Sequence, residues 1–140
     1  MEITIGMRGE ASLRVTEQDT ALALGSGSLP VLATPRMVAL MEEAACAAIA
    51  PALGEGQTSV GTALTIAHSA ATPVGMDVRA VAEVTAVNGR AISFQVTAYD
   101  TVGEIGSGTH ERFLVMAERF TEKAYGKLDS HDSKHKAKEA

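Results

Sequence analysis

The chain has 140 residues, of which 46% are hydrophobic and 21% charged, so it is long enough for one domain with a sizeable core and too short for two. Its net charge of −5 excludes a general binder of nucleic-acid backbones, and the lack of any run of about 18 apolar residues excludes a membrane-spanning segment. With one cysteine, Cys46, and no apolar signal sequence at its start, we expect a cytoplasmic protein without an intrachain disulfide.

A short strand and a long helix are the first elements predicted. Residues 9–15 alternate like a strand, and a loop rich in glycine, serine and proline follows. Thr34 then precedes Pro35 and a run of helix formers over residues 37–50. Threonine at the N-cap and proline at the first helical position are typical of a helix start. Pro51 marks the expected end of this helix.

Four further strands are predicted after the helix by their period-two alternation. They cover residues 58–70, 76–88, 90–100 and 104–120. Asn88-Gly89 is a strong signal for a two-residue hairpin. One strand, one helix and four antiparallel strands predict an α+β fold, in which the helix covers one face of an antiparallel sheet.

The C-terminal tail is the second part of the predicted organisation. The ordered domain is expected to cover residues 1–122, and residues 123–140 are expected to form a disordered polar tail because they show no apolar periodicity. His131 and His135 lie in this tail, where a metal site is possible in principle but a solvated segment is favoured. No metal-ligand spacing stands out elsewhere, so no metal is expected.

Two adjacent glutamates in the helix differ in their expected surroundings. An advance of about 100° per residue places Glu43 opposite the apolar face and Glu42 at the edge of that face. A partly desolvated carboxylate at position 42 would be the better base. The alternative, which the helix alone favours, is a boundary glutamate that reaches water.

His68 is the candidate partner of Glu42. It lies on the larger apolar face of the strand at 58–70, which should face the helix, whereas Gly61 lies on the opposite face. A histidine and a glutamate that turn toward one layer can form a base and its orienting group. A core histidine with hydrogen-bonded nitrogen atoms is the alternative.

Thr34 and Arg112 are candidate functional residues, but a structural role would also explain each of them. Capping alone accounts for a threonine at a helix start, although a hydroxyl there could also be a nucleophile. Thr34 and Glu42 are about 12 Å apart along the helix axis, so they would flank a substrate rather than touch. Arg112 follows two strand glycines and could hold a carboxylate or phosphate, or form a surface ion pair.

Three segments carry a resemblance to a known family. TPRMVALMEEAACAAIAP, SVGTALTIAHSAATPVGMDV and DTVGEIGSGTHERFLV resemble the fluoroacetyl-CoA thioesterase group of hotdog proteins, in register from about residue 34 to residue 120. The resemblance implies a hotdog fold, in which an antiparallel sheet wraps around one central helix. It also implies an acyl-CoA thioesterase with no separate cofactor, since CoA is part of the substrate, and a homodimer with active sites at the subunit interface.

The resemblance also assigns roles to individual residues. It implies that Thr34, Glu42 and His68 are catalytic and that Gly61 and Arg112 place the acyl group. The sequence leaves open whether Thr34 or Glu42 forms the covalent intermediate.

One segment departs from the family pattern. The fluoroacetyl-CoA enzyme has phenylalanines before and just after its catalytic threonine that cover the acyl pocket, whereas GSGSLPVLATPR has no aromatic residue. We therefore expect a short acyl-CoA substrate without specificity for fluoroacetyl-CoA.

Two other functions are alternatives to hydrolysis. A hotdog hydratase or dehydratase usually needs an aspartate near the helix start, and none occurs between Asp19 and Asp77. A non-catalytic acyl-CoA-binding module is disfavoured by the retained candidate catalytic residues.

Overall fold

A computed structural model describes residues 2–139, with side chains described for residues 2–129. Its five strands form one antiparallel sheet in the order β1-β3-β4-β5-β2. They are β1 Arg8–Arg14, β2 Gln57–His68, β3 Asp77–Asn88, β4 Ala91–Asp100 and β5 Glu104–Met116. The predicted α+β arrangement is confirmed, although β5 ends four residues before the expected end because a helix begins at Ala117.

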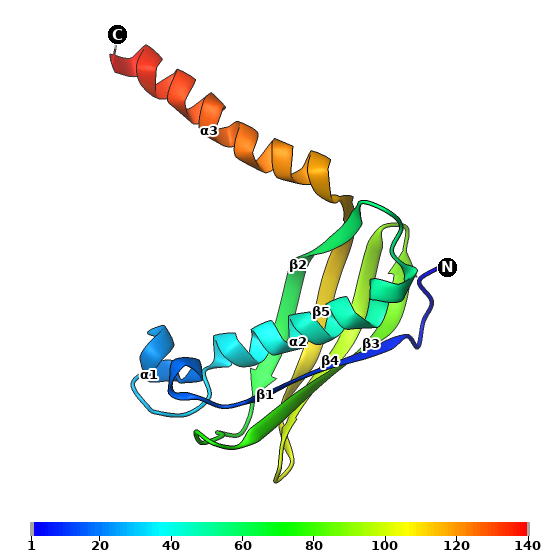
Figure 1. Ribbon diagram of the computed structural model, residues 1–140, viewed down its shortest axis with the longest axis vertical. Helices are drawn as coiled ribbons and strands as arrows, with labels where there is room; N and C mark the ends of the chain where they lie inside the picture. The colour runs from blue at the N-terminus through cyan, green and yellow to red at the C-terminus, as the bar shows by residue number, and fades with distance from the viewer. Residues whose placement is uncertain (1, 140) are drawn as a thin grey trace.

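The long helix α2 (Thr34–Ile49) lies across one face of the sheet, which curls around it (Figure 1). The apolar face of α2 is buried against the sheet: Met37, Leu40, Met41, Ala44, Ala45, Ala48 and Ile49. A Cβ at Gly9 of β1 would collide with the α2 backbone at Ala44 and Ala48, so the absence of a side chain there lets helix and strand pack closely. The helix is thereby fixed in position over the sheet.

Short helical turns occur where the sequence predicted only loop. The turn η1 (Glu17–Asp19) and the helix α1 (Ala21–Leu24) lie between β1 and α2, and the turn η2 (Ala50–Ala52) follows α2. Thr20 caps α1, because its side chain accepts a hydrogen bond from the amide of Ala23 at 3.2 Å.

β2 is an edge strand of the sheet, and residues 61–65 in its middle are exposed. An edge strand presents unpaired backbone groups to which another chain can pair. This open edge lies beside α2 and leads directly to His68, the last residue of β2.

The C-terminal segment forms α3 (Ala117–Glu139), which leaves the end of β5 and projects away from the sheet (Figure 1). The sequence predicted a disordered tail from residue 123, whereas the backbone here is helical as far as Glu139. Many of its residues are strong helix formers such as Ala, Glu and Lys. The side chains of His131 and His135 lie outside the described ones, and the domain boundary at residue 122 stays a prediction. Within the described chain, no helix is long and apolar enough to cross a membrane.

Candidate active site

Thr34 lies at the start of α2, but it does not cap this helix. The N-cap is Ala33 and Thr34 is the first helical residue, so the prediction of a threonine cap was wrong. The Thr34 hydroxyl is instead hydrogen-bonded to His68, with Oγ1 2.7 Å from Nδ1. The end of β2 therefore meets the start of α2 in a hydroxyl–imidazole pair.

The imidazole of His68 is half-buried, and this affects its protonation. Burial lowers the pKa of His68 from its ordinary value, and the backbone of Ala70 partly opposes this effect. When Thr34 donates its proton to Nδ1, a neutral His68 carries its own proton on Nε2. Nε2 is buried and has no hydrogen-bond partner in the described chain. A buried donor without a hydrogen-bond partner destabilises the folded protein by about 1–3 kcal/mol. We therefore expect a further group to bind next to Nε2.

A cavity of about 330 Å³ opens beside this pair. Its walls come from α1, the loop that follows and the chain after β2: Ala21, Ser26, Gly27, Ser28, Leu29, Val31, Leu32, Thr34, His68, Ser69, Ala70 and Ala71. Apart from His68 none of these residues is aromatic, and none is a lysine or an arginine. The cavity therefore has room for an acyl group next to the Thr34 hydroxyl.

Glu42 and Arg112 form a second polar group. Nη1 of Arg112 lies 3.4 Å from Oε2 of Glu42. The Arg112 guanidinium is buried and donates further hydrogen bonds to Oγ and the carbonyl oxygen of Ser59, at 2.7 and 3.0 Å. The Glu42 side chain is 41% exposed and Glu43 is exposed, which confirms the predicted difference between the two glutamates.

Gly61 also belongs to this second group, contrary to the strand pattern. Alternation placed Gly61 on the face away from the helix, but a bulge shifts the register between Gly61 and Ala63. Gly61 pairs with Arg112, and a Cβ built on it would lie 2.8 Å from Oε2 of Glu42. The extra residue of the bulge reverses the side of the sheet that Gly61 faces, so the prediction of its orientation was wrong.

His110 is a part of the site that sequence reasoning did not select. Its Nδ1 lies 2.9 Å from the carbonyl oxygen of Ala63, and its Nε2 lies 3.1 Å from Nη1 of Arg112. A guanidinium only donates, so Nε2 accepts and Nδ1 carries the proton. His110 thus holds the Arg112 guanidinium in place. Its position two residues before Arg112, on the same strand face, was the available signal.

The two polar groups are separate within one chain. His68 and Gly61 are seven positions apart on β2, which corresponds to about 23 Å of strand. No hydrogen bond or ion pair of the described chain joins Thr34 or His68 to Glu42 or Arg112. Over the same residues, no cluster of three or more His, Cys, Asp and Glu side chains could hold a metal ion.

Comparisons with known proteins agree with this architecture. A family model described as fluoroacetyl-CoA-specific thioesterase matches residues 15–118. A fluoroacetyl-CoA thioesterase from Streptantibioticus cattleyicolor is 50% identical over 93 residues, which are 66% of this chain and 67% of that protein. A solved structure of the fluoroacetyl-CoA thioesterase aligns with a TM-score of 0.85 at 40% identity, over 91% of this chain and 98% of the other.

Two more distant structures have the same fold. A hypothetical protein of the thioesterase superfamily from Thermus thermophilus is 30% identical, with a TM-score of 0.84 over 94% of this chain and 96% of its own. A hot-dog-like protein from Thermanaerovibrio acidaminovorans is 23% identical, with a TM-score of 0.79 over 88% of this chain and 91% of its own. The predicted hotdog fold is confirmed.

Proposed function

This chain belongs to the family of fluoroacetyl-CoA-specific thioesterases and is a thioester hydrolase, and we propose that it cleaves a short acyl-CoA into the free acid and CoA. The observation that carries this proposal is the 2.7 Å contact between Thr34 Oγ1 and His68 Nδ1. A hydroxyl hydrogen-bonded to a neutral imidazole is a nucleophile with its base. CoA is part of the substrate, and no separate cofactor is proposed.

In the first proposed step, Thr34 Oγ attacks the thioester carbonyl carbon and its proton passes to Nδ1 of His68. The amides of Arg36 and Met37 donate to the carbonyl of Ala33, whereas no backbone acceptor within the described chain receives the amide of Thr34. This amide can therefore donate to the carbonyl oxygen as it becomes negative. The C–S bond then breaks, and the proton from His68 passes to the departing CoA thiolate.

In the second proposed step, water cleaves the acyl-threonine ester. Glu42 would take a proton from the attacking water and return it to Thr34 Oγ as the ester C–O bond breaks, which releases the acid and restores both the Thr34 hydroxyl and the Glu42 carboxylate. The Arg112 guanidinium, 3.4 Å from Glu42, holds this side chain in position.

We further propose that a second copy of the chain completes each site. Antiparallel pairing of two β2 edges about Leu64 and Thr65 would set His68 of one copy opposite Gly61 of the other. The Glu42 carboxylate of the second copy could then accept the proton on the buried Nε2 of His68. This homodimer would join the two polar groups that one chain keeps apart.

The proposed substrate range is short acyl groups in general. The relative from Streptantibioticus cattleyicolor is named for fluoroacetyl-CoA. The cavity beside Thr34 is lined here by the glycine- and serine-rich segment 26–29, without a phenylalanine to restrict it. A cytoplasmic location stays a prediction.

A thiol-release assay across a panel of acyl-CoAs, with fluoroacetyl-CoA beside acetyl-CoA, tests the function. We expect release with several short acyl groups and its loss in Glu42→Gln and in His68→Ala. Glu43→Gln is the matched control, because Glu43 is exposed on the same helix. Full activity in both site variants would contradict the proposed catalytic group. Hydration of an enoyl-CoA would favour the hydratase alternative, and tight CoA-ester binding without release would favour a binding module.

A further inference from the structure

The positive charges of this chain are distributed unevenly. All five lysines lie in the range of α3: Lys123, Lys127, Lys134, Lys136 and Lys138. Residues 1–116 contain 6 basic and 12 acidic residues, whereas residues 117–140 contain 6 basic and 5 acidic residues. The net charge is therefore 6 − 12 = −6 for residues 1–116 and 6 − 5 = +1 for residues 117–140, so an anion is repelled by the body and not by the α3 segment.

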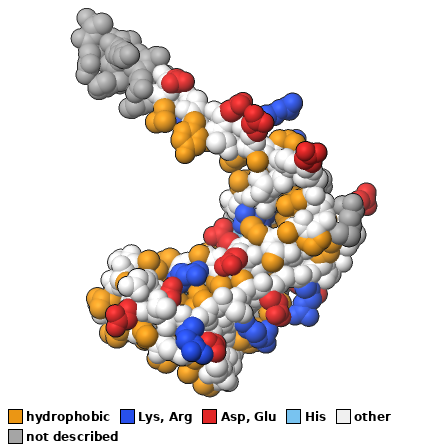
Figure 2. Space-filling view, in the orientation of Figure 1, with side chains coloured by type: hydrophobic (Ala, Val, Ile, Leu, Met, Phe, Trp, Pro, Cys, Tyr) orange, Lys and Arg blue, Asp and Glu red, His pale blue; other side chains and the backbone are white. Residues whose placement is uncertain are grey.

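Three of these cations form a stripe on the described part of the helix. Arg119, Lys123 and Lys127 are spaced four residues apart, so they lie along one side of α3. All three are exposed, and Figure 2 shows α3 standing clear of the body with charged side chains along it. Glu118 and Glu122 lie about 100° or more around the helix from the middle of this stripe.

Helix stability does not account for the stripe. Like charges four residues apart destabilise a helix by a few tenths of a kcal/mol. Up to residue 129, none of the three cations of the stripe lies in an ion pair. By contrast, each ion pair within the body contains one of four arginines: Arg14, Arg36, Arg79 and Arg112. The stripe is therefore available to an external anion.

The proposed substrate supplies such an anion. CoA carries three phosphate groups, which its long pantetheine arm separates from the thioester. The cavity at Thr34 and His68 has no lysine or arginine in its walls, so it offers no cation to these phosphates. Phosphate groups bind best to charge-assisted donors such as lysine and arginine.

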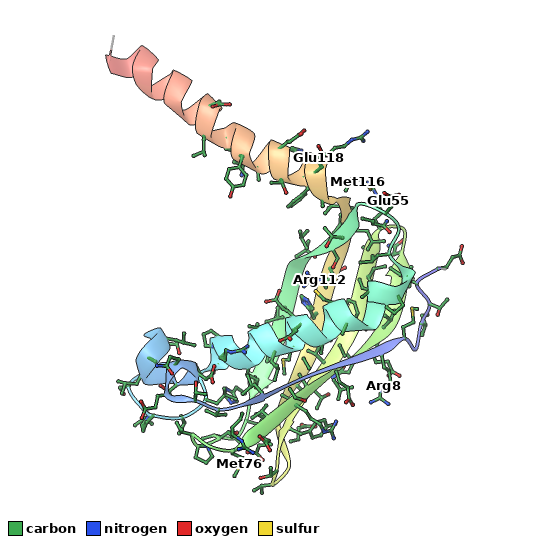
Figure 3. All side chains as sticks on the ribbon, viewed as in Figure 1. Arg8, Glu55, Met76, Arg112, Met116 and Glu118 are labelled. Carbon is green, nitrogen blue, oxygen red and sulfur yellow. The ribbon has the colours of Figure 1, made fainter. Side chains whose placement is uncertain are left out.

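α3 begins close to the second polar group of the site. Arg112 lies between α2 and the end of β5, where Met116 and Glu118 mark the start of α3 (Figure 3). Four strand residues, or about 13 Å, separate Arg112 from Met116. In the proposed dimer, Glu42 and Arg112 of one copy face Thr34 and His68 of the other, so α3 flanks the joint site.

We propose that the stripe of Arg119, Lys123 and Lys127 binds the CoA phosphates of the acyl-CoA whose thioester lies in the joint site. This inference rests on the proposed function and on the proposed dimer. It assigns a second, electrostatic part of substrate binding to α3, outside the catalytic group.

Steady-state kinetics on two substrates test the stripe. Acetyl-CoA carries the phosphates, and the acetyl thioester of N-acetylcysteamine has the same reacting group without them. We expect Lys123→Gln/Lys127→Gln to raise KM for acetyl-CoA about tenfold, with kcat and the N-acetylcysteamine reaction unchanged. Glutamine keeps the helix propensity of α3. Arg8→Glu, at the opposite edge of the sheet (Figure 3), lowers the net charge by the same amount and should leave both reactions unchanged.

The outcomes separate this inference from the proposed function. An unchanged KM for acetyl-CoA in the double variant would overturn the inference. An equal rise in KM for both substrates in the double variant, or an equal rise in KM for acetyl-CoA in Arg8→Glu, would also overturn it. If the wild type hydrolyses neither thioester, the proposed function fails. In that case, binding of CoA and of pantetheine to the wild type and to the double variant is measured by calorimetry. If the double variant binds CoA more weakly than the wild type but binds pantetheine equally well, the inference is supported. If the two proteins bind CoA equally well, the inference is overturned.

Discussion

Oε2 of Glu42 lies 2.8 Å from the position that a Cβ on Gly61 would occupy. A helix carboxylate and a strand backbone thus approach each other where a side chain would separate them. The Cβ position is also 3.4 Å from Nη1 of Arg112, so Gly61 leaves space for the whole ion pair. The position of the Glu42 carboxylate therefore depends on the absence of a side chain on the neighbouring strand.

Gly61→Ala should displace the Glu42 carboxylate while the fold is retained, because Glu42 can swing toward solvent. A displacement of about 1 Å can cost on the order of 10²-fold in rate, so we expect kcat/KM to fall by at least tenfold. Gly103→Ala is the control, since a Cβ there has nothing within 4 Å. Thiol release and thermal unfolding together check the prediction. Unchanged kcat/KM in Gly61→Ala would show that Glu42 does not need this position.

The pH dependence of hydrolysis should report the burial of His68. Only the neutral imidazole can accept the Thr34 proton, and burial lowers the pKa of His68 below its ordinary value of about 6.5. kcat/KM should therefore persist as pH falls through 6.5 and decline only below it. A decline centred at or above 6.5 would contradict a buried base.

The free energy of unfolding should also depend on the protonation of His68, and like kcat/KM it should decrease as pH falls. Between the lowered folded-state pKa of His68 and its unfolded value, the unfolded chain binds more protons. The free energy of unfolding should therefore decrease as pH falls below about 6.5, and less so in His68→Gln. Denaturant unfolding at a series of pH values measures this difference. An equal pH dependence in both proteins would place the titration elsewhere.

Mixing two inactive variants should restore activity if each site is shared between copies. A mixed dimer of Thr34→Ala and Glu42→Gln chains has one site with both residues intact, because Thr34 and Glu42 of one site come from different chains. After random exchange of subunits, about a quarter of the wild-type activity is expected. Each variant alone should stay inactive. No recovery despite proven subunit exchange would mean that each site lies within one chain.

A chain that ends at residue 122 should fold as well as the full chain. α3 projects from the sheet and its described side chains are exposed, so their loss removes little buried surface. We expect the unfolding temperature to change by less than about 4 °C, which corresponds to under about 1 kcal/mol. A chain that ends at Phe113 is the contrasting case, because it loses residues of β5 that pair with β2. A large loss of stability in the chain that ends at residue 122 would contradict the predicted domain boundary.

Local periodicity was sufficient for the five strands, for the long helix α2 and for the surroundings of Glu42, but not for the short helical turns or for α3. The strands, the helix and the Asn88-Gly89 hairpin follow from patterns that recur every 2 or 3.6 residues, because these periods decide which side chains face the core. The different burial of Glu42 and Glu43 is a property of one helix, so it was also predictable. The family resemblance then assigned candidate roles to residues on different elements.

Tertiary structure decided the contacts between elements. One extra residue in β2 turned Gly61 toward Glu42, and no alternation rule reports a bulge before the partner strand is known. From the sequence alone, helix capping explains Thr34. In the structure the N-cap is Ala33, and the Thr34 hydroxyl is hydrogen-bonded to His68, 34 residues along the chain. The sequence by itself determined which faces are apolar. Only the tertiary structure determined that Thr34 of α2 meets His68 of β2 and that Glu42 of α2 meets Arg112 of β5, because these contacts depend on where separate elements cross.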